Sequence, residues 1–317
     1  MLVFSVQSIK ADSYIVYSND NHQVIEEKNS HEVQSVASIS KIMTALVAIE
    51  QGELNEIITV SSKAPQQIGS SLYLVEGQQV TLISLLYGLM LRSGNDAAYE
   101  IAVNVAGSVE DFVALMNQKA EEIGMKDSTF VNPSGLDEED GGNLSSCYDM
   151  ALCMSEAMKY PIFNQIVSTK YYDHEVGGKW KNKNKLLFDY PFVNGGKTGY
   201  TKNAGKTLVS SANNGYGESI VVSFRNDEYF KFHEDKHTEY FNDYRSLSII
   251  DKGIYHIRGK VIEVSEHLCF VSKLENVNEI SVKTIFTKDG LKLVVSNQVE
   301  TQTYELPYQS KSMRWFS

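Results

Sequence analysis

The sequence VASISKIMTAL at residues 36–46 contains the pattern around which the rest of the chain can be interpreted. Ser38 and Lys41 are three positions apart, so on a helix their side chains diverge by only about 60° and share one face. Apolar residues at helical spacing would bury this helix in a core: Ile42, Ala45, Leu46 and Ile49. A lysine amine can then reach a serine hydroxyl, and burial next to a helix start lowers the pKa of such an amine.

Ser-x-x-Lys alone does not establish a site, because the pattern is short and also fits a helix start with a surface lysine. A second polar stretch, Ser93-Gly94-Asn95, follows an apolar helix expected over residues 81–90. A turn there would present a hydroxyl and an amide from a rigid support, although simple capping of the next helix explains the same residues. A third stretch, Gly196-Lys197-Thr198-Gly199-Tyr200, enters a region of strand-forming residues.

Composition limits the classes of protein to which the chain can belong. Its 317 residues are 42% hydrophobic, enough for one large domain or for a large and a small one. A net charge of −11 without a basic stripe argues against a nucleic-acid partner. Three cysteines make no even framework, so we expect no disulfide, and no apolar run reaches the ~18 residues of a membrane span. Residues 1–11 fit either a shortened export signal or a first strand, and residues 311–317 are too short for an anchor.

The order of the expected elements indicates an α+β fold. Five strands are expected, at residues 14–17, 23–25, 193–200, 206–212 and 219–224. Helices are expected at residues 38–51, 81–90, 108–124, 146–160 and 240–256. The sequence therefore predicts a five-stranded antiparallel sheet flanked by helices, with an all-helical region inserted, in residues 1–257. Short strands beyond this point predict a small β-rich domain in residues 258–317.

Two other motifs suggest different chemistry and are weaker. Gly-Lys-Thr occurs at Gly196 and at Gly205, but neither has the glycine five positions earlier that a phosphate loop requires, and both lie among strands. His233-Glu234-Asp235-Lys236-His237 matches the H-E-x-x-H pattern of zinc peptidases. Its charged neighbours, and the lack of an obvious third ligand, favour a solvated loop or helix start. We therefore expect no metal site.

The three polar stretches together form a specific pattern. Ser-x-x-Lys, Ser-Asp-Asn and Lys-Thr-Gly, in this order, are the signature of serine β-lactamases and penicillin-binding proteins. The sequence around them resembles the D-alanyl-D-alanine carboxypeptidases, the low-molecular-mass penicillin-binding proteins that trim peptidoglycan stem peptides. The quoted likeness includes residues 37–45, 93–98, 130–136 and 196–201. It covers roughly residues 12–257 and implies a fold of the β-lactamase/transpeptidase type.

The resemblance implies a role for each catalytic residue. Ser38 would form an acyl-enzyme with the substrate, and Lys41 would be its general base. Ser93 and Asn95 would complete the polar network. No metal or organic cofactor is implied.

The resemblance also implies how substrate is held. Lys197 and Thr198 would bind the carboxylate of the terminal D-alanine, and Gly199 would let the backbone approach closely. The N–H groups of Ser38 and Tyr200 would form an oxyanion hole. The expected partners are peptidoglycan stem peptides ending in D-Ala-D-Ala, and β-lactams as covalent inhibitors. The substrate implies an extracytoplasmic location. Any association with the membrane or the cell wall would be peripheral.

Two alternatives stay open at this point. A class A β-lactamase would need a glutamate in an E-x-x-L-N motif after the second stretch, whereas Leu-Asn occurs only at Leu54-Asn55. The second stretch also has Gly94 in place of aspartate. The other alternative is a catalytically idle, peptidoglycan-binding homologue, although every signature residue is present.

Overall fold

A computed structural model describes residues 11–137, 142–175 and 178–309. The expectations for residues 1–10 and 311–317 therefore lie outside the described residues. The described chain divides into two compact units. The first unit comprises residues 11–17, 24–213 and 220–237, and the second comprises residues 18–23, 214–219 and 238–309.

The elements up to α8 alternate between short strands and helices. The first half contains β1 (Ser13–Ser18), β2 (Gln23–Lys28), β3 (Gln34–Ser35), a 3₁₀ turn η1 (Ala37–Ser40), α1 (Lys41–Gln51), β4 (Ile57–Thr59), η2 (Ala64–Gln66), β5 (Gln79–Thr81), α2 (Leu82–Tyr87), a π-helical turn η3 (Gly88–Arg92), α3 (Asn95–Ala106) and α4 (Val109–Glu122). It continues with β6 (Leu144–Ser145), α5 (Cys147–Met158), α6 (Pro161–Ser168), β7 (Tyr171–Asp173), β8 (Lys179–Lys181), α7 (Leu186–Asp189), β9 (Val193–Thr201), β10 (Gly205–Asn213), β11 (Glu218–Phe224) and α8 (Tyr229–Asp243).

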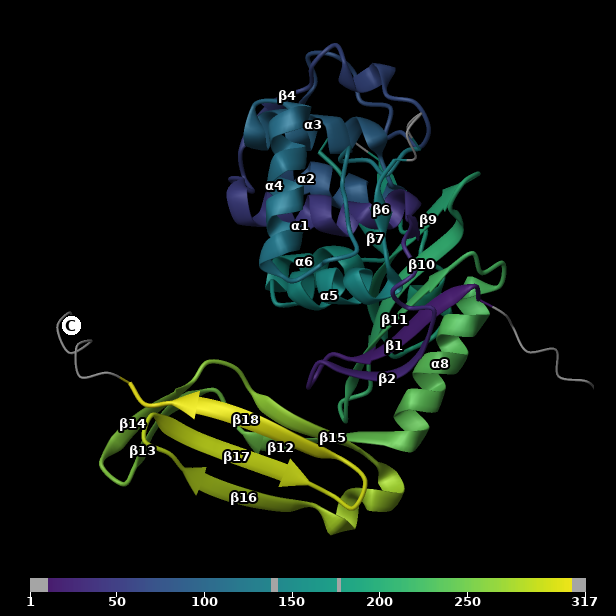
Figure 1. The fold of residues 1–317 in the computed structure, drawn as a ribbon. Helices are drawn as coiled ribbons and strands as arrows, with labels where there is room; N and C mark the ends of the chain where they lie inside the picture. Colours follow the sequence, from purple (N-terminus) through teal and green to yellow (C-terminus); the bar gives the residue numbers. More distant parts are fainter. Residues whose placement is uncertain (1–10, 138–141, 176–177, 310–317) are drawn as a thin grey trace, which may run out of the picture. The chain divides into compact units, whose positions relative to one another are not determined.

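The main sheet has five strands in the order β2-β1-β11-β10-β9, so the N-terminal hairpin joins the later meander as predicted. Strand β9 is at the edge of the sheet and pairs antiparallel with β10, with Lys197 opposite Val209 and Gly199 opposite Thr207. Helices α1 to α6 lie on one side of the sheet and α8 on the other (Figure 1). The predicted α+β fold with an inserted helical region is therefore confirmed.

Helix α1 lies in the middle of the helical core. Every residue from 41 to 48 is buried, and Ile42, Met43 and Leu46 are completely inaccessible to solvent. A helix that is apolar on nearly every side must be covered by other elements. Its N-terminal end follows η1 directly, and η1 lies against β9 and β10 of the sheet. Within the described residues, no helix is long and apolar enough to cross a membrane.

The prediction of a helix over residues 240–256 is wrong for most of this range. Helix α8 ends at Asp243, and the chain continues as β12 (Tyr244–Ile250) and β13 (Gly253–Ile257). Strand β12 pairs antiparallel with β15 (Leu268–Lys273). The apolar residues of this stretch fit a 3.6-residue period and a two-residue period equally well, and pairing with β15 decides between them. Residues 238–257, expected with the sheet, belong to the second unit.

The second unit is rich in strands, as expected beyond residue 258. It also contains β14 (Lys260–Val264), a 3₁₀ segment η4 (Leu274–Glu279), β16 (Ser281–Phe286), β17 (Gly290–Ser296) and β18 (Thr301–Pro307). Strands β16, β17 and β18 form one sheet, and the pairs β12-β15 and β13-β14 form two more. Its small core consists of Ile262, Val264, Leu291, Leu293 and Leu306. The three cysteines of the chain are free and buried.

Candidate active site

The turn that carries Ser38 places its hydroxyl next to a buried amine. Ser38 lies in η1, whose first residue, Ala37, has a left-handed backbone with φ of 53°. Lys41 begins α1, and its Nζ lies 3.1 Å from Ser38 Oγ. Ser38 is half-buried, whereas Lys41 has no exposed surface. The predicted pairing of these two residues is present in the structure.

The environment of Lys41 favours a neutral amine. Burial in the core holds the pKa of Lys41 well below its usual range, and the nearby charges of Lys197 and Lys183 lower it further. A neutral amine has a free electron pair, so it can accept the proton of a hydroxyl that attacks a carbonyl. The combination of a depressed pKa and direct contact with a hydroxyl is typical of an activated nucleophile.

The second polar stretch meets the same amine. Asn95 is the first residue of α3, and its Oδ1 accepts a hydrogen bond of 2.8 Å from Lys41 Nζ. Its Nδ2 donates to the carbonyl of Ile68 at 2.7 Å, which sets the orientation of the amide. Ser93, just before it, has a left-handed backbone with φ of 66° that turns the chain between η3 and α3. Strain of this kind in a non-glycine residue is common at functional sites.

The edge strand β9 supplies a second buried amine. Lys197 is only 2% exposed, and its Nζ donates to Ser93 Oγ at 3.1 Å and to the carbonyl of Thr198 at 2.7 Å. Burial, followed by the charge of Lys183, lowers the pKa of Lys197 to about 7. Thr198 is half-buried and Tyr200 is exposed, so this part of the strand is open to solvent.

Gly199 lets β9 lie directly against the serine turn. A Cβ atom at this position would lie 3.1 Å from the nitrogen of Ile39 and 3.1 Å from the carbonyl oxygen of Val36. It would also lie 2.3 Å from Thr207 Oγ1, which donates a 3.0 Å hydrogen bond to the same Val36 carbonyl. Only a residue without a side chain fits here, and the predicted need for close backbone approach has this physical basis.

The three stretches therefore converge. Hydrogen bonds join Lys41 to Ser38 and Asn95, and a further bond joins Ser93 to Lys197. The charge of Lys197 acts on Lys41, which is consistent with both lysines lying in one site. The side chain of Tyr200 is 67% exposed, and the role expected for this residue concerns its main-chain N–H alone.

Sequence reasoning assigned no role to the loop at residues 130–136, although the structure brings it into the site. The carbonyl oxygen of Ser134 accepts a hydrogen bond from Lys41 Nζ and another, at 3.5 Å, from Ser38 Oγ. Asn132 shapes this loop, because its Oδ1 accepts from the N–H groups of Ser134 at 3.1 Å and Gly135 at 2.7 Å. The Asn-Pro-Ser-Gly run was a turn signal, but a turn signal does not say what the turn contacts.

The sequence predicted a solvated loop or helix start for the H-E-x-x-H stretch, and this prediction is wrong. His233 and His237 lie inside α8 and are fully buried. Ser210 Oγ lies 2.7 Å from His233 Nδ1 and 2.8 Å from His237 Nε2, and Ser223 Oγ lies 2.9 Å from His233 Nε2. Both ring nitrogens of His233 thus contact serines of β10 and β11. The described residues contain no group of three or more side chains able to hold a metal ion.

The fold and the converging stretches define a class, the penicillin-binding proteins and DD-transpeptidases. Penicillin-binding protein 5 from Haemophilus influenzae superposes with a TM-score of 0.81 over 96% of this chain and 98% of that chain, at 22% identity. A D-alanyl-D-alanine carboxypeptidase structure from Mycobacterium tuberculosis has a TM-score of 0.69 and 30% identity, over 73% of this chain and 90% of that one.

Within this class, the chain belongs to the D-alanyl-D-alanine carboxypeptidase family, Peptidase S11. The sequence model of this family matches residues 3–228. D-alanyl-D-alanine carboxypeptidase DacF from Bacillus subtilis is 33% identical over 319 residues, covering 94% of this chain and 81% of that protein. DacD from Escherichia coli is 36% identical over 228 residues, covering 68% of this chain and 58% of that protein.

Proposed function

We propose that this chain is a serine D-alanyl-D-alanine carboxypeptidase, which hydrolyses the terminal D-alanine from peptidoglycan stem peptides. The observation that carries the proposal is the contact of 3.1 Å between the buried amine of Lys41 and the hydroxyl of the half-buried Ser38. The family match over residues 3–228 supports the substrate class. Because peptidoglycan lies outside the cytoplasm, the same proposal places the chain in the cell envelope or its surroundings.

In the proposed mechanism, Ser38 Oγ attacks the carbonyl carbon of the bond between the two D-alanines. Neutral Lys41 accepts the hydroxyl proton as the new C–O bond forms. The N–H groups of Ser38 and Tyr200 stabilise the negative oxygen of the tetrahedral intermediate, a contribution of roughly 3–4 kcal/mol for such a donor. The C–N bond then breaks, the amine of the leaving D-alanine receives a proton through the network that includes Ser93, and an ester on Ser38 remains.

Water completes the cycle. It attacks the ester carbonyl, its proton returns to the Lys41 network, and the shortened peptide leaves with Ser38 restored. Lys197 and Thr198 are proposed to hold the terminal carboxylate during the first step, because among the described residues the Lys197 ammonium donates only to neutral oxygens. A β-lactam would acylate the same serine. Its slow release would make it an inhibitor.

Release of D-alanine from a pentapeptide ending in D-Ala-D-Ala tests the proposal. Purified protein should release D-alanine and should become labelled by a fluorescent penicillin, and Ser38→Ala should do neither. Ser281→Ala, which removes an exposed serine of β16, is the matched control and should behave as the unmodified protein. Rapid steady hydrolysis of penicillin would instead favour a β-lactamase, and absence of labelling would favour an idle homologue.

A further inference from the structure

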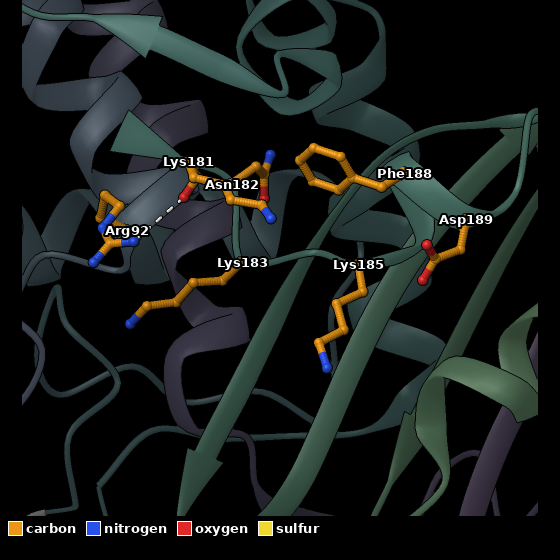
Figure 2. Close-up of a pocket in the computed structure, with 7 residues that line it drawn as sticks. All are labelled: Arg92, Lys181, Asn182, Lys183, Lys185, Phe188 and Asp189. Atoms are coloured by element: carbon orange, nitrogen blue, oxygen red, sulfur yellow. Dashed lines mark hydrogen bonds between the residues drawn. The ribbon is translucent and has the colours of Figure 1, made fainter. Parts of the chain in front are cut away.

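A cavity of about 420 Å³ in the first unit is lined by an excess of positive side chains. Its lining residues are Arg92, Lys181, Asn182, Lys183, Lys185, Phe188 and Asp189 (Figure 2). Four of these are cations and one is a carboxylate, in a chain whose net charge is −11. In Figure 2 the side chains of Lys183 and Lys185 leave the segment between β8 and α7 separately, Lys183 toward the left and Lys185 toward the bottom of the view. This concentration of positive charge is local and opposite in sign to the protein as a whole.

Neutral groups hold these cations in place. Lys183 Nζ donates to Ser70 Oγ at 3.2 Å, and Arg92 Nη1 donates to the carbonyl of Lys181 at 3.4 Å. Lys181 Nζ lies 4.8 Å from the centre of the Phe188 ring. Among the ion pairs of the described residues, none includes any of the four cations of the cavity. Their charge is therefore available to an anion, with the Phe188 ring as an apolar side.

The cavity borders the catalytic residues. The N–H of Lys183 donates to the carbonyl of Leu91 at 3.1 Å, two residues before Ser93. The carbonyl of Ser70, whose hydroxyl contacts Lys183, accepts from the N–H of Asn95 at 2.7 Å. The charge of Lys183 also lowers the pKa of both Lys41 and Lys197, as expected for neighbouring groups.

We propose that this cavity is a subsite for a second carboxylate of the peptide substrate, on the part that becomes the acyl group. The inference rests on the proposed function. In that mechanism the carboxylate of the leaving D-alanine binds Lys197 and Thr198, and the leaving group carries no other anion. A further anionic group at a neighbouring cavity must then come from the retained part of the peptide. The subsite makes the enzyme selective for stem peptides with a free acidic branch over the same peptides with that branch amidated.

Two matched pentapeptides test this selectivity. Both end in D-Ala-D-Ala, and they differ only in one acyl-side group, a free carboxylate in one and its carboxamide in the other. The ratio of their kcat/KM values should favour the acid by about tenfold, the contribution of one hydrogen-bonded charge pair. The double variant Lys181→Gln/Lys185→Gln should bring the ratio close to one. Lys179→Gln is the matched control, because Lys179 lies on the same strand but pairs with Asp173 outside the cavity, and it should keep the full ratio.

The outcomes separate this inference from the proposed function. If the unmodified protein labels with penicillin and cleaves both peptides with equal kcat/KM, the subsite is refuted and the carboxypeptidase assignment stands. If it neither labels nor cleaves, the proposed function fails and the subsite with it. If the double variant still prefers the peptide with the free carboxylate, the assignment of the cavity is also overturned, because another group must then bind that carboxylate.

Discussion

Gly199→Ala should displace the edge strand from the serine turn and slow acylation. The added Cβ would lie 2.3 Å from Thr207 Oγ1, which is 1.1 Å less than the 3.4 Å at which ordinary contact begins. The nitrogen of Ile39 and the carbonyl oxygen of Val36, each 3.1 Å away, leave little room in the other direction. Strand β9 must therefore move by about 1 Å, a misplacement that costs about 100-fold in rate at a catalytic site.

The rate constant for labelling by a fluorescent penicillin measures this effect directly. Far-ultraviolet circular dichroism of the variant establishes that the chain is still folded. Gly253→Ala is the matched control, because an added Cβ in β13 would have its nearest contact at 3.7 Å, with Tyr255. The double variant Gly199→Ala/Thr207→Ala removes the closest contact and should recover about tenfold of the loss, since the two contacts of 3.1 Å remain. A folded Gly199→Ala variant that acylates at the unmodified rate would falsify the reasoning.

The remaining predictions concern groups that gain or lose a proton. Lys41→Arg keeps a charge that cannot be given up near neutrality, so penicillin labelling should slow by about 10²–10⁴-fold, and labelling at the normal rate would rule out this general base. Because the pKa of Lys197 is lowered to about 7, its ammonium is lost as pH rises, and kcat/KM for a carboxylate-ended peptide should fall about tenfold from about pH 6 to 8. A flat profile would contradict this role of Lys197. Burial lowers the pKa of His233, and it lowers the pKa of His237 to about 3. Below about pH 6.5 both histidines therefore bind protons in the unfolded chain while they are still neutral in the folded chain. Urea unfolding should therefore show roughly 1.4 kcal/mol less stability per histidine at about pH 5.5 than at pH 7.5, and His237→Gln should remove half of this difference.

Local chemistry made several elements predictable. Ser108, expected at the start of a helix, accepts a hydrogen bond from the N–H of Asp111 and caps α4. The hairpin of β1 and β2 followed from two apolar runs separated by turn residues. In each case the signal and the contact that it predicts lie within a few residues of each other, so tertiary packing had little to add.

Other features depended on which face of an element meets the core. The charged residues between His233 and His237 predicted that this stretch would be exposed to solvent. On α8 these residues lie on other faces of the helix, while both buried histidines contact serines of the sheet. Nothing in the sequence indicated a role for Lys183. Its contact with Ser70 and the effect of its charge on Lys41 and Lys197 arise only when these separate segments pack together. Helical and strand periods were also indistinguishable in the stretch that became β12.

By itself, the sequence determined the residue types of the site, their order along the chain and the family, because three short polar stretches in a fixed order can be recognised without knowing how the chain packs. Only the tertiary structure decided that Lys41 is buried and Lys197 lies beside Ser93, that the Ser134 carbonyl completes the site, and that a positive cavity adjoins it. Burial and charge proximity arise when distant segments pack together, and they set the pKa values on which the proposed chemistry depends.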